Sequence, residues 1–496
     1  MPEAIPIGNK RQLFLDGYLI EWRDKMWRRV CPASKHPQNP VLRPEAAWEP
    51  IGYLTFGSVL YDEEDAIYKM WCLGMGGSQL EGVDHYQSHG VFYFTSRDGI
   101  RWERPELDVV SIAGQPTNIV ALSERAQCGM SLPAFRELFG VSKDPHGQDP
   151  QRRYKLGYLY VVRDYTGPNQ DWRHPGQLRG LAVAFSPDGI HWTPTPEPVT
   201  TAIHDGGTHW FRDPRTGRFR LYGRTQRFSE DVEALYGEDR HFQLTNAARA
   251  VNYVESQDFL NWEPEKGTFI IAADVLDGPN DEIYSMSVFP YEDVYIGLVQ
   301  MFYNHQDDSW LDIQLAVSRD GIHFQRLSDR SPFIPRGQVG EWDRFNQSVA
   351  NNEPIRVADE LRFYYSGRDY RHSGVYKGED NGSKAGLRYR AAVGIATTKQ
   401  DRFAAMEASF DAGKLLTKPL ILDGPRIHVN ANVSFGSLEV TLLDPEGQPL
   451  ERMQAKVSET DATDIPIPLD LSAFLGKPLR IQFTLANGQL YSFWTP

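Results

Sequence analysis

The sequence predicts an all-β protein: a five-bladed β-propeller followed by a small C-terminal antiparallel β-sandwich. Three observations lead to this prediction. A turn motif recurs along most of the chain, paired apolar runs precede its copies, and the residue pattern changes after residue 410.

The recurring motif is a Ser-x-Asp turn followed by an aromatic residue. It reads SRDGIRW at 96–102, SPDGIHW at 186–192, SQDFLNW at 256–262 and SRDGIHF at 318–324, with a degenerate copy, ATTKQDRF, at 396–403. Such spacing fits one four-stranded propeller blade per copy. Because a short Asp side chain bonds backbone N–H groups and Gly permits positive φ, we interpret these turns as scaffold and not as site.

Paired apolar runs around a polar turn, the pattern of a β-hairpin, precede the motif copies. They lie at 57–74, 208–224, 284–303 and 352–368, and another begins near 152. Each leads into a third strand, the motif turn, and a short fourth strand that starts at the aromatic residue. Helical periodicity is almost absent, and only LPAFRELFG at 132–140 is interpreted as a short helical turn.

The pattern predicts three regions. Residues 1–44 form an N-terminal extension that packs on the propeller, and its strand-like stretch at 11–22 supports the first or last blade. Residues 45–410 form the propeller. Residues 411–496 alternate cleanly around the turns DPEGQ and ANGQ, which is typical of an antiparallel sandwich.

Composition excludes several classes of function. A net charge of −14 argues against nucleic acid as a partner, and three cysteines without CxxC spacing exclude a disulfide framework and a thiolate zinc site. No apolar run reaches membrane-spanning length, so no membrane partner is expected. No signal-peptide pattern is visible, so we expect a cytoplasmic protein, or a secreted or periplasmic one if a leader was removed. The sequence leaves the oligomeric state open.

Candidate catalytic residues are carboxylates directly upstream of the predicted inner strands, because inner strands line a propeller's axis. Acid–base chemistry on a glycosidic bond needs two such groups. Adjacent strand residues face opposite ways, so only one of Asp281 and Glu282 can point inward. The candidates are Glu49 before blade one, Asp205 before blade three, Asp281 and Glu282 before blade four, and Asp343, with Glu341, before blade five.

Further polar residues near strand ends are candidates for substrate binding. They are His204, His209, Arg224, Arg249, Tyr284, Asn304, His305, Asn346 and Arg368. Arginines that face one channel would suit a carboxylated sugar, because guanidinium binds carboxylate in a bidentate manner. No Walker loop, GxGxxG, HExxH or GxSxG motif is present, so no cofactor and no metal ligands are predicted. The sequence leaves open whether the channel holds a structural divalent cation.

The S-x-D-G-x-x-W turns, together with HDGGTHWFRDPRTGRFRLYGR at 204–224, resemble the five-bladed propeller glycoside hydrolases, the clan of families 43 and 32 with its distant relatives. The resemblance covers about residues 45–410. The chain departs from the family in its first blade, where AAWEPIGYLTFGSVLYD replaces the usual Asp-Pro segment. It therefore resembles a divergent branch, to which neither the usual first-blade acid nor the family's substrate can be carried over.

The resemblance implies a glycoside hydrolase that acts on a carbohydrate substrate. Asp281 or Glu282 would be the general acid, Asp205 would orient or tune it, and Glu49 or Asp343 would be the third carboxylate. One alternative is a propeller that binds carbohydrate without catalysis. Others are a polysaccharide lyase, with His209, His305 or Tyr284 near an arginine, a phosphorylase, or a protein-interaction propeller.

Overall fold

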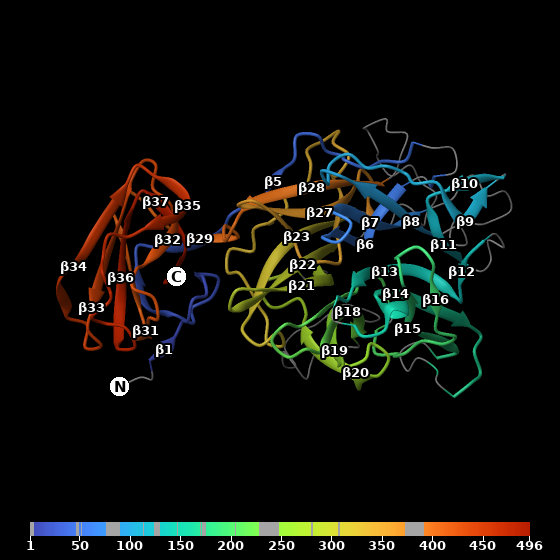
Figure 1. The fold of residues 1–496 in the computed structure, drawn as a ribbon, viewed down its shortest axis with the longest axis horizontal. Coiled ribbons are helices and arrows are strands. Elements are labelled where there is room, and N and C mark those ends of the chain that lie inside the picture. Colours follow the sequence, from blue (N-terminus) through green and yellow to red (C-terminus); the bar gives the residue numbers. More distant parts are fainter. Residues whose placement is uncertain are drawn as a thin grey trace.

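The computed structural model describes residues 4–45, 49–50, 52–75, 90–112, 114–123, 129–145, 147–168, 170, 175–203, 205–227, 248–278, 281–305, 308–372 and 391–496. Within them nearly all regular structure is β, and the described helical segment is a 3₁₀ turn at Pro150–Arg152. Figure 1 shows two bodies side by side, a large ring of sheets and a smaller sandwich that contains both chain ends. No helix in this part of the chain is long and apolar enough to cross a membrane.

The ring is a five-bladed β-propeller, as predicted. Each blade is an antiparallel sheet whose strands follow one another outward from the axis. Blade one contains β6 (Gly52–Asp62), β7 (Ile67–Met75), β8 (Gly90–Ser96) and β11 (Ile119–Ser123), and blade two contains β13 (Phe135–Lys143), β14 (Tyr154–Arg163), β15 (Gln177–Ser186) and β16 (Thr193–Pro194). Blade three contains β17 (His209–Arg212), β18 (Phe219–Arg227), β19 (Ala248–Ser256) and β20 (Trp262–Ile271). Blade four contains β21 (Asp281–Tyr291), β22 (Val294–His305), β23 (Asp308–Ser318) and β24 (Gln325–Arg326).

Blade five closes the ring with residues from both ends of the propeller sequence. Its strands are β25 (Asn346–Val349), β27 (Glu360–Arg368), β28 (Ala391–Lys399) and the short β5 (Ser34–Lys35), with β26 (Ile355–Val357) beside β27. Strand β28 also meets β6 of blade one in a single parallel pairing. Smaller pieces border blade one: β9 (Leu107–Ile112), β10 (Gln115–Thr117) and β12 (Ser131–Leu132).

The second blade differs from the sequence interpretation. Residues 132–140 are not helical: Phe135–Lys143 form β13, the innermost strand of blade two, and pair with β14. The apolar residues of LPAFRELFG have helix-like spacing, but β13 is buried between blades, where packing against neighbouring strands outweighs local propensity.

The motif turns hold neighbouring blades together. In three of them the glycine has positive φ, 72° at Gly99, 82° at Gly189 and 79° at Gly321. The carbonyl of each glycine accepts a hydrogen bond from an aromatic side chain of the preceding blade. The donors are Tyr364 to Gly99 at 2.7 Å, Trp71 to Gly189 at 2.8 Å and Tyr222 to Gly321 at 2.9 Å.

The inner strands are joined across the axis by polar contacts. The side-chain amide of Asn351, after β25, donates to the carbonyl of Phe139 in β13, and its oxygen accepts from Ser287 of β21 at 3.2 Å. Its backbone N–H donates to Gly57 of β6 at 2.8 Å. One side chain and its backbone therefore tie four of the five blades together.

The sandwich consists of two sheets that both include N-terminal strands. One sheet contains β1 (Ile5–Pro6), β3 (Ile20–Asp24), β30 (Gly413–Thr417), β31 (Leu420–Ile421), β33 (Ser437–Leu443), β34 (Pro449–Ser458) and β36 (Pro478–Ala486). The other contains β2 (Gln12–Leu13), β4 (Trp27–Val30), β29 (Ala404–Ala408), β32 (His428–Asn432), β35 (Asp461–Pro466) and β37 (Gly488–Trp494).

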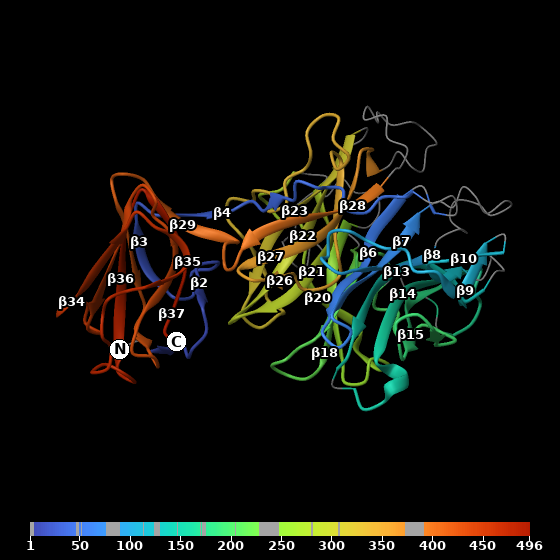
Figure 2. The same ribbon diagram turned by 45° about the horizontal axis from the view of Figure 1, so that its top comes forward.

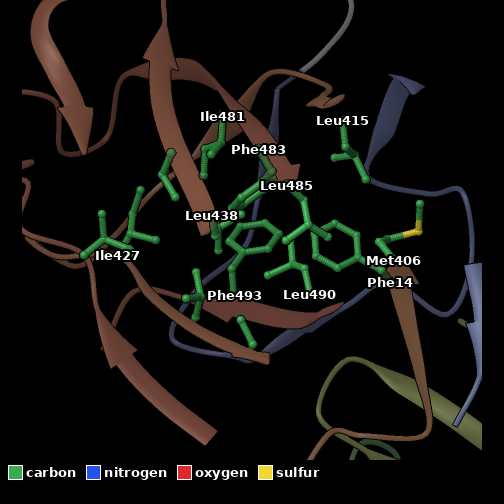
Figure 3. Close-up of a cluster of buried hydrophobic side chains, with 14 of the residues drawn as sticks. Phe14, Met406, Leu415, Ile427, Leu438, Ile481, Phe483, Leu485, Leu490 and Phe493 are labelled. Atoms are coloured by element: carbon green, nitrogen blue, oxygen red, sulfur yellow. The ribbon is translucent and has the colours of Figure 1, made fainter. Parts of the chain in front are cut away.

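The pairing of the N-terminal strands corrects the expectation that residues 11–22 support the first or last blade. Strand β2 pairs with β37 and β3 pairs with β30, both in the sandwich, and only β5 reaches blade five. Phe14 lies in the sandwich core, with ring centroids 5.8 Å from Phe483 and 5.6 Å from Phe493 (Figure 3). Strand alternation in the sequence shows that a segment is half buried but does not show against which sheet.

The degenerate fifth turn connects the two bodies. Asp401 is fully buried, and its carboxylate accepts hydrogen bonds from Tyr291 of blade four at 2.7 Å, Arg11 at 2.8 Å and Ser492 of the sandwich at 2.6 Å. In Figure 2, β29 and β4 run from this junction into the sandwich. Asp401, the aspartate of the most degenerate motif copy, therefore has hydrogen-bond partners far away in the sequence.

Candidate active site

An acid–arginine pair, with a buried Arg224 and a partly exposed Asp205, lies where the inner strands of blades two to four begin. Oδ1 of Asp205, just before β17, is 2.5 Å from Nη2 of Arg224 at the end of β18 and 4.0 Å from Nη2 of Arg179 in β15. The backbone N–H of Gly206 also donates to Oδ1 at 2.9 Å. Burial by itself would raise the pKa of Asp205, but these two guanidinium groups outweigh burial and hold it well below the ordinary aspartate value.

Glu137 of β13 is the second acid of this cluster. Its Oε2 packs so closely on Gly206 that a β-carbon there would collide with it. Burial first, and then the negative charge of Asp205, raise the pKa of Glu137 above the ordinary glutamate value, although Arg224 opposes the rise. The pKa values of these two neighbouring carboxyl groups are therefore shifted in opposite directions. In such a pair, the group with the raised pKa can act as the acid, and the ionised group favours its protonated form.

An aromatic ring links these residues to blade five. The guanidinium carbon of Arg224 lies 3.9 Å from the ring centroid of Tyr284 in β21, within cation–π distance. The hydroxyl of Tyr284 is 3.0 Å from Nε2 of His372, which follows the end of β27. Burial, reinforced by Arg368, Arg249 and Arg224, lowers the pKa of His372 well below its ordinary value, so His372 is neutral.

Glu282, not Asp281, faces this cluster. Oε2 of Glu282 accepts from Nη1 of Arg249 at 2.8 Å and from its backbone N–H at 3.0 Å, and Oε1 accepts from Asn304 at 3.1 Å. The guanidinium carbon of Arg249 is 5.6 Å from the ring of Tyr284. Asp281 instead accepts from the N–H of Gly278 at 2.7 Å.

The charge of Asp281 acts on the opposite face of the blade. Burial, reinforced by Asp281, raises the pKa of Asp312 in β23 to about 6. The strand alternation that left the choice between Asp281 and Glu282 open is resolved by their different partners.

Blade five contributes two of the predicted binding residues. Asn346 and Arg368 are directly paired across β25 and β27. The amide of Asn346 donates to the carbonyl of Tyr370 at 2.5 Å, and the guanidinium carbon of Arg368 is 5.7 Å from the ring of Tyr370. Both therefore position the segment that carries His372.

His209 lies deeper, among the inner strands. Its Nδ1 accepts from the backbone N–H of Val288 in β21 at 3.1 Å, which joins blades three and four. Burial lowers the pKa of His209 to about 3, so the ring is neutral and Nε2 carries the proton. This geometry favours a structural role.

Two predicted carboxylates have partners away from this cluster. Glu49 accepts from Arg104 at 2.7 Å and from Tyr53 at 2.6 Å. Asp343 pairs with Lys35 of β5 at 2.7 Å and accepts from Tyr365 at 2.8 Å. Both are buried groups satisfied by structural partners, because proximity in sequence to an inner strand does not fix the direction of a loop side chain.

Two predicted residues cannot be placed: His204 and the side chain of His305 lie outside what the structure describes. Conversely, Glu137, Arg179 and His372 belong to the cluster but were missed from the sequence. Glu137 was missed because β13 was interpreted as a helical turn. Counting back from the SPDGIHW motif to the expected inner strand would have found it.

The described residues contain no group of three or more His, Cys, Asp or Glu side chains that could hold a metal ion. Asp205 and Glu282 are instead paired with arginines. What the cluster offers chemically is acid–base groups and cationic hydrogen-bond donors.

Fold and site together define the class: a five-bladed propeller with a carboxyl–arginine cluster at one end of its axis. No protein-family profile matches the chain, and no curated protein matches it. Solved structures that match include propeller glycoside hydrolases, and three matches are described here.

An arabinoxylan arabinofuranohydrolase of family 43 from Bacillus subtilis, solved with cellotetraose, is 12% identical, with 94% of this chain and 99% of that chain covered and a TM-score of 0.41. A thermostable family-43 glycoside hydrolase is 14% identical, with 75% and 95% covered and a TM-score of 0.45. An N-acetylgalactosamine deacetylase from F. plautii, solved with blood group B trisaccharide, is 14% identical, with 77% and 97% covered and a TM-score of 0.41. Likenesses of this size transfer no activity, so function must be inferred from the residues of this chain.

Proposed function

We propose that this protein is a glycoside hydrolase whose general acid is Glu137. The observation that carries the proposal is the Glu137–Asp205 pair, in which burial and the Asp205 charge favour a protonated Glu137. A carboxyl group with a raised pKa keeps its proton to a higher pH and can donate it to the leaving oxygen of a glycosidic bond.

Asp205 tunes the acid in this proposal. Arg224 and Arg179 keep it ionised, and its negative charge adds to burial in raising the pKa of Glu137. The role expected for Asp205 from the sequence is retained, whereas the acid is Glu137 in place of Asp281 or Glu282.

Glu282 is the second carboxylate of the reaction. Arg249 and Asn304 fix the direction of both its oxygens, and Arg249 approaches the same tyrosine ring as Arg224. A carboxylate held in this way can either activate water or attack the anomeric carbon, and the separation of the carboxyl groups in the substrate complex selects between them.

The test is a rate comparison on plant and algal oligosaccharides and aryl glycosides, with activity expressed per folded molecule. Glu137→Gln is expected to lower kcat/KM by roughly 10²- to 10⁴-fold, the contribution of a general acid. Asp343→Asn is the control, since it removes a buried carboxylate whose partner, Lys35, lies away from the cluster. Full activity of Glu137→Gln, or equal losses in both variants, would contradict the proposal.

A second candidate, polysaccharide lysis, is favoured by one contact. The hydroxyl of Tyr284 lies 3.0 Å from Nε2 of a neutral His372, beside Arg224, so it can pass its own proton to Nε2 as it takes the proton next to a substrate carboxylate. Lysis yields an unsaturated sugar that absorbs ultraviolet light, whereas hydrolysis yields none. The same assay therefore separates the two reactions.

A further inference from the structure

Two arginines of blade three, Arg224 and Arg249, converge on one aromatic and histidine cluster. Arg224 and Arg249 lie 3.9 Å and 5.6 Å from the ring centroid of Tyr284, and Arg249 lies 5.0 Å from that of Phe302. The ring of Phe302 is in turn 4.7 Å from His372. Side chains that start more than a hundred residues apart in the sequence thus meet around one point.

Several N–H donors of these arginines have no hydrogen-bond acceptor in the described part of the chain. Arg224 is only 3% exposed; its Nη2 contacts Asp205 and its guanidinium interacts with Tyr284, whereas its Nε and Nη1 meet no acceptor at hydrogen-bond geometry in the described part of the chain. The buried Nε of Arg249 likewise has no hydrogen-bond partner in the described part of the chain. Burying cationic donors without acceptors is costly, so these donors favour an acceptor from outside the protein, which a ligand oxygen can supply.

The local charge is opposite to that of the whole chain. Arg179 and Arg224 lie beside Asp205, Arg249 pairs with Glu282, and Arg368 acts on His372, whereas the full chain carries a net charge of −14. An acidic protein repels anions at long range, so a cationic site within it must bind its anion by direct contact.

We propose that this site takes an acidic carbohydrate, and that the carboxylate of a uronic acid unit binds between Arg224 and Arg249. The planar guanidinium matches a carboxylate through two parallel hydrogen bonds, which neutral sugar hydroxyls cannot reproduce. The proposal rests on the proposed function for what happens to the sugar, but not for which sugar binds.

The test measures affinity and reaction separately. Calorimetric titration of Glu137→Gln compares oligouronates with the same oligosaccharides after reduction of the carboxyl groups to alcohols. The acidic form is expected to bind roughly 10- to 100-fold tighter, the range for hydrogen bonds to charged groups. Added salt is expected to reduce the preference. Initial rates of the wild type on each pair provide a second measurement that does not depend on that variant.

Arginine variants locate the effect. Arg249→Gln should abolish the preference for the acidic form, and Arg249→Lys should restore part of it, because charge returns without the bidentate fork. Arg319→Gln is the matched control: Arg319 pairs with Asp16 at 2.8 Å with 25% side-chain exposure, the same distance and exposure as Arg249 in its pair with Glu282.

Each outcome separates the inference from the proposed function. Equal binding of acidic and reduced sugars, or binding of neither, overturns the uronate proposal, and hydrolysis of a neutral sugar would then still support the hydrolase. Tight acid-selective binding without hydrolysis supports the uronate site and contradicts the hydrolase. A preference for sulfated or phosphorylated sugars over uronates overturns the carboxylate assignment.

Discussion

The two ends of the blades use acidic residues in opposite ways. At the motif end, Asp98, Asp188, Asp258 and Asp320 repeat one local pattern: the carboxylate accepts from the N–H groups two and three residues later and from the preceding serine hydroxyl. At the other end, Asp205 and Glu282 are paired with arginines from other strands.

A residue that repeats in every blade and a residue that acts on a ligand are therefore recognised by different signs in the sequence. A group that bonds its own turn can recur in every blade, because the turn supplies all its partners. A group that acts on a ligand must differ from its counterparts, since a single axis needs one acid and not five. The third turn shows how far the scaffold tolerates change: Phe259 replaces glycine with φ of 67°, and its fully buried ring packs 5.4 Å from Trp210.

The largest expected effect contrasts one substitution at each end. Asp205→Asn should lower kcat/KM by roughly 10²- to 10⁴-fold per folded molecule, because Glu137 loses the charge that holds its proton. Asp188→Asn should leave kcat/KM unchanged. Initial rates on the same substrate check both, and a similar loss in the two variants would mean that the ends do not differ in this way.

The next largest effect compares two turns. Asp401→Ala leaves Arg11, Tyr291 and Ser492 without their shared acceptor, and should lower the free energy of unfolding by about 3–5 kcal/mol, as for other broken buried ion pairs. Asp188→Ala should cost about 1 kcal/mol, since its partners are N–H groups near water. Urea unfolding measures both, and equal costs would contradict the special role of the fifth turn.

The pH dependences should run in opposite directions. Although burial opposes it, hydrogen bonding from the turn lowers the pKa of Asp188 and of Asp258 to about 2, so the stability from these ionised groups is present near neutral pH and is lost as the pH falls toward 2. Glu137 has a raised pKa, so activity should fall as the pH rises through that value.

Thermal unfolding measured against pH checks the acid limb of stability, and kcat/KM measured against pH checks the alkaline limb of activity. The alkaline limb of activity should persist in Asp188→Asn, whereas the acid limb of stability becomes shallower. An alkaline limb that begins at the ordinary glutamate value would argue against Glu137 as the acid.

The smallest expected effect concerns a bond between blades. Tyr364→Phe removes the donor to the Gly99 carbonyl at the junction of blades five and one, and should lower the free energy of unfolding by about 1 kcal/mol. Tyr61→Phe, at an exposed tyrosine, is the control and should have no effect. A neutral Tyr364→Phe would mean that strand pairing alone closes the ring.

The sequence determined the architecture, because period-two alternation and turn chemistry are local properties that repeat in every blade. The Ser-x-Asp turns, the five blades and the C-terminal sandwich all follow from such patterns. Asp205, Arg224, Arg249 and Glu282 were found because residues just before inner strands and at the ends of second strands lie near a propeller's axis.

Tertiary structure alone decided which partners each segment meets. It placed the N-terminal strands in the sandwich, turned Glu49 and Asp343 toward Arg104 and Lys35, and brought Glu137 against Asp205. These outcomes depend on contacts between residues far apart in the chain, and on burial and charge that exist only once those contacts form. No local pattern of letters contains that information.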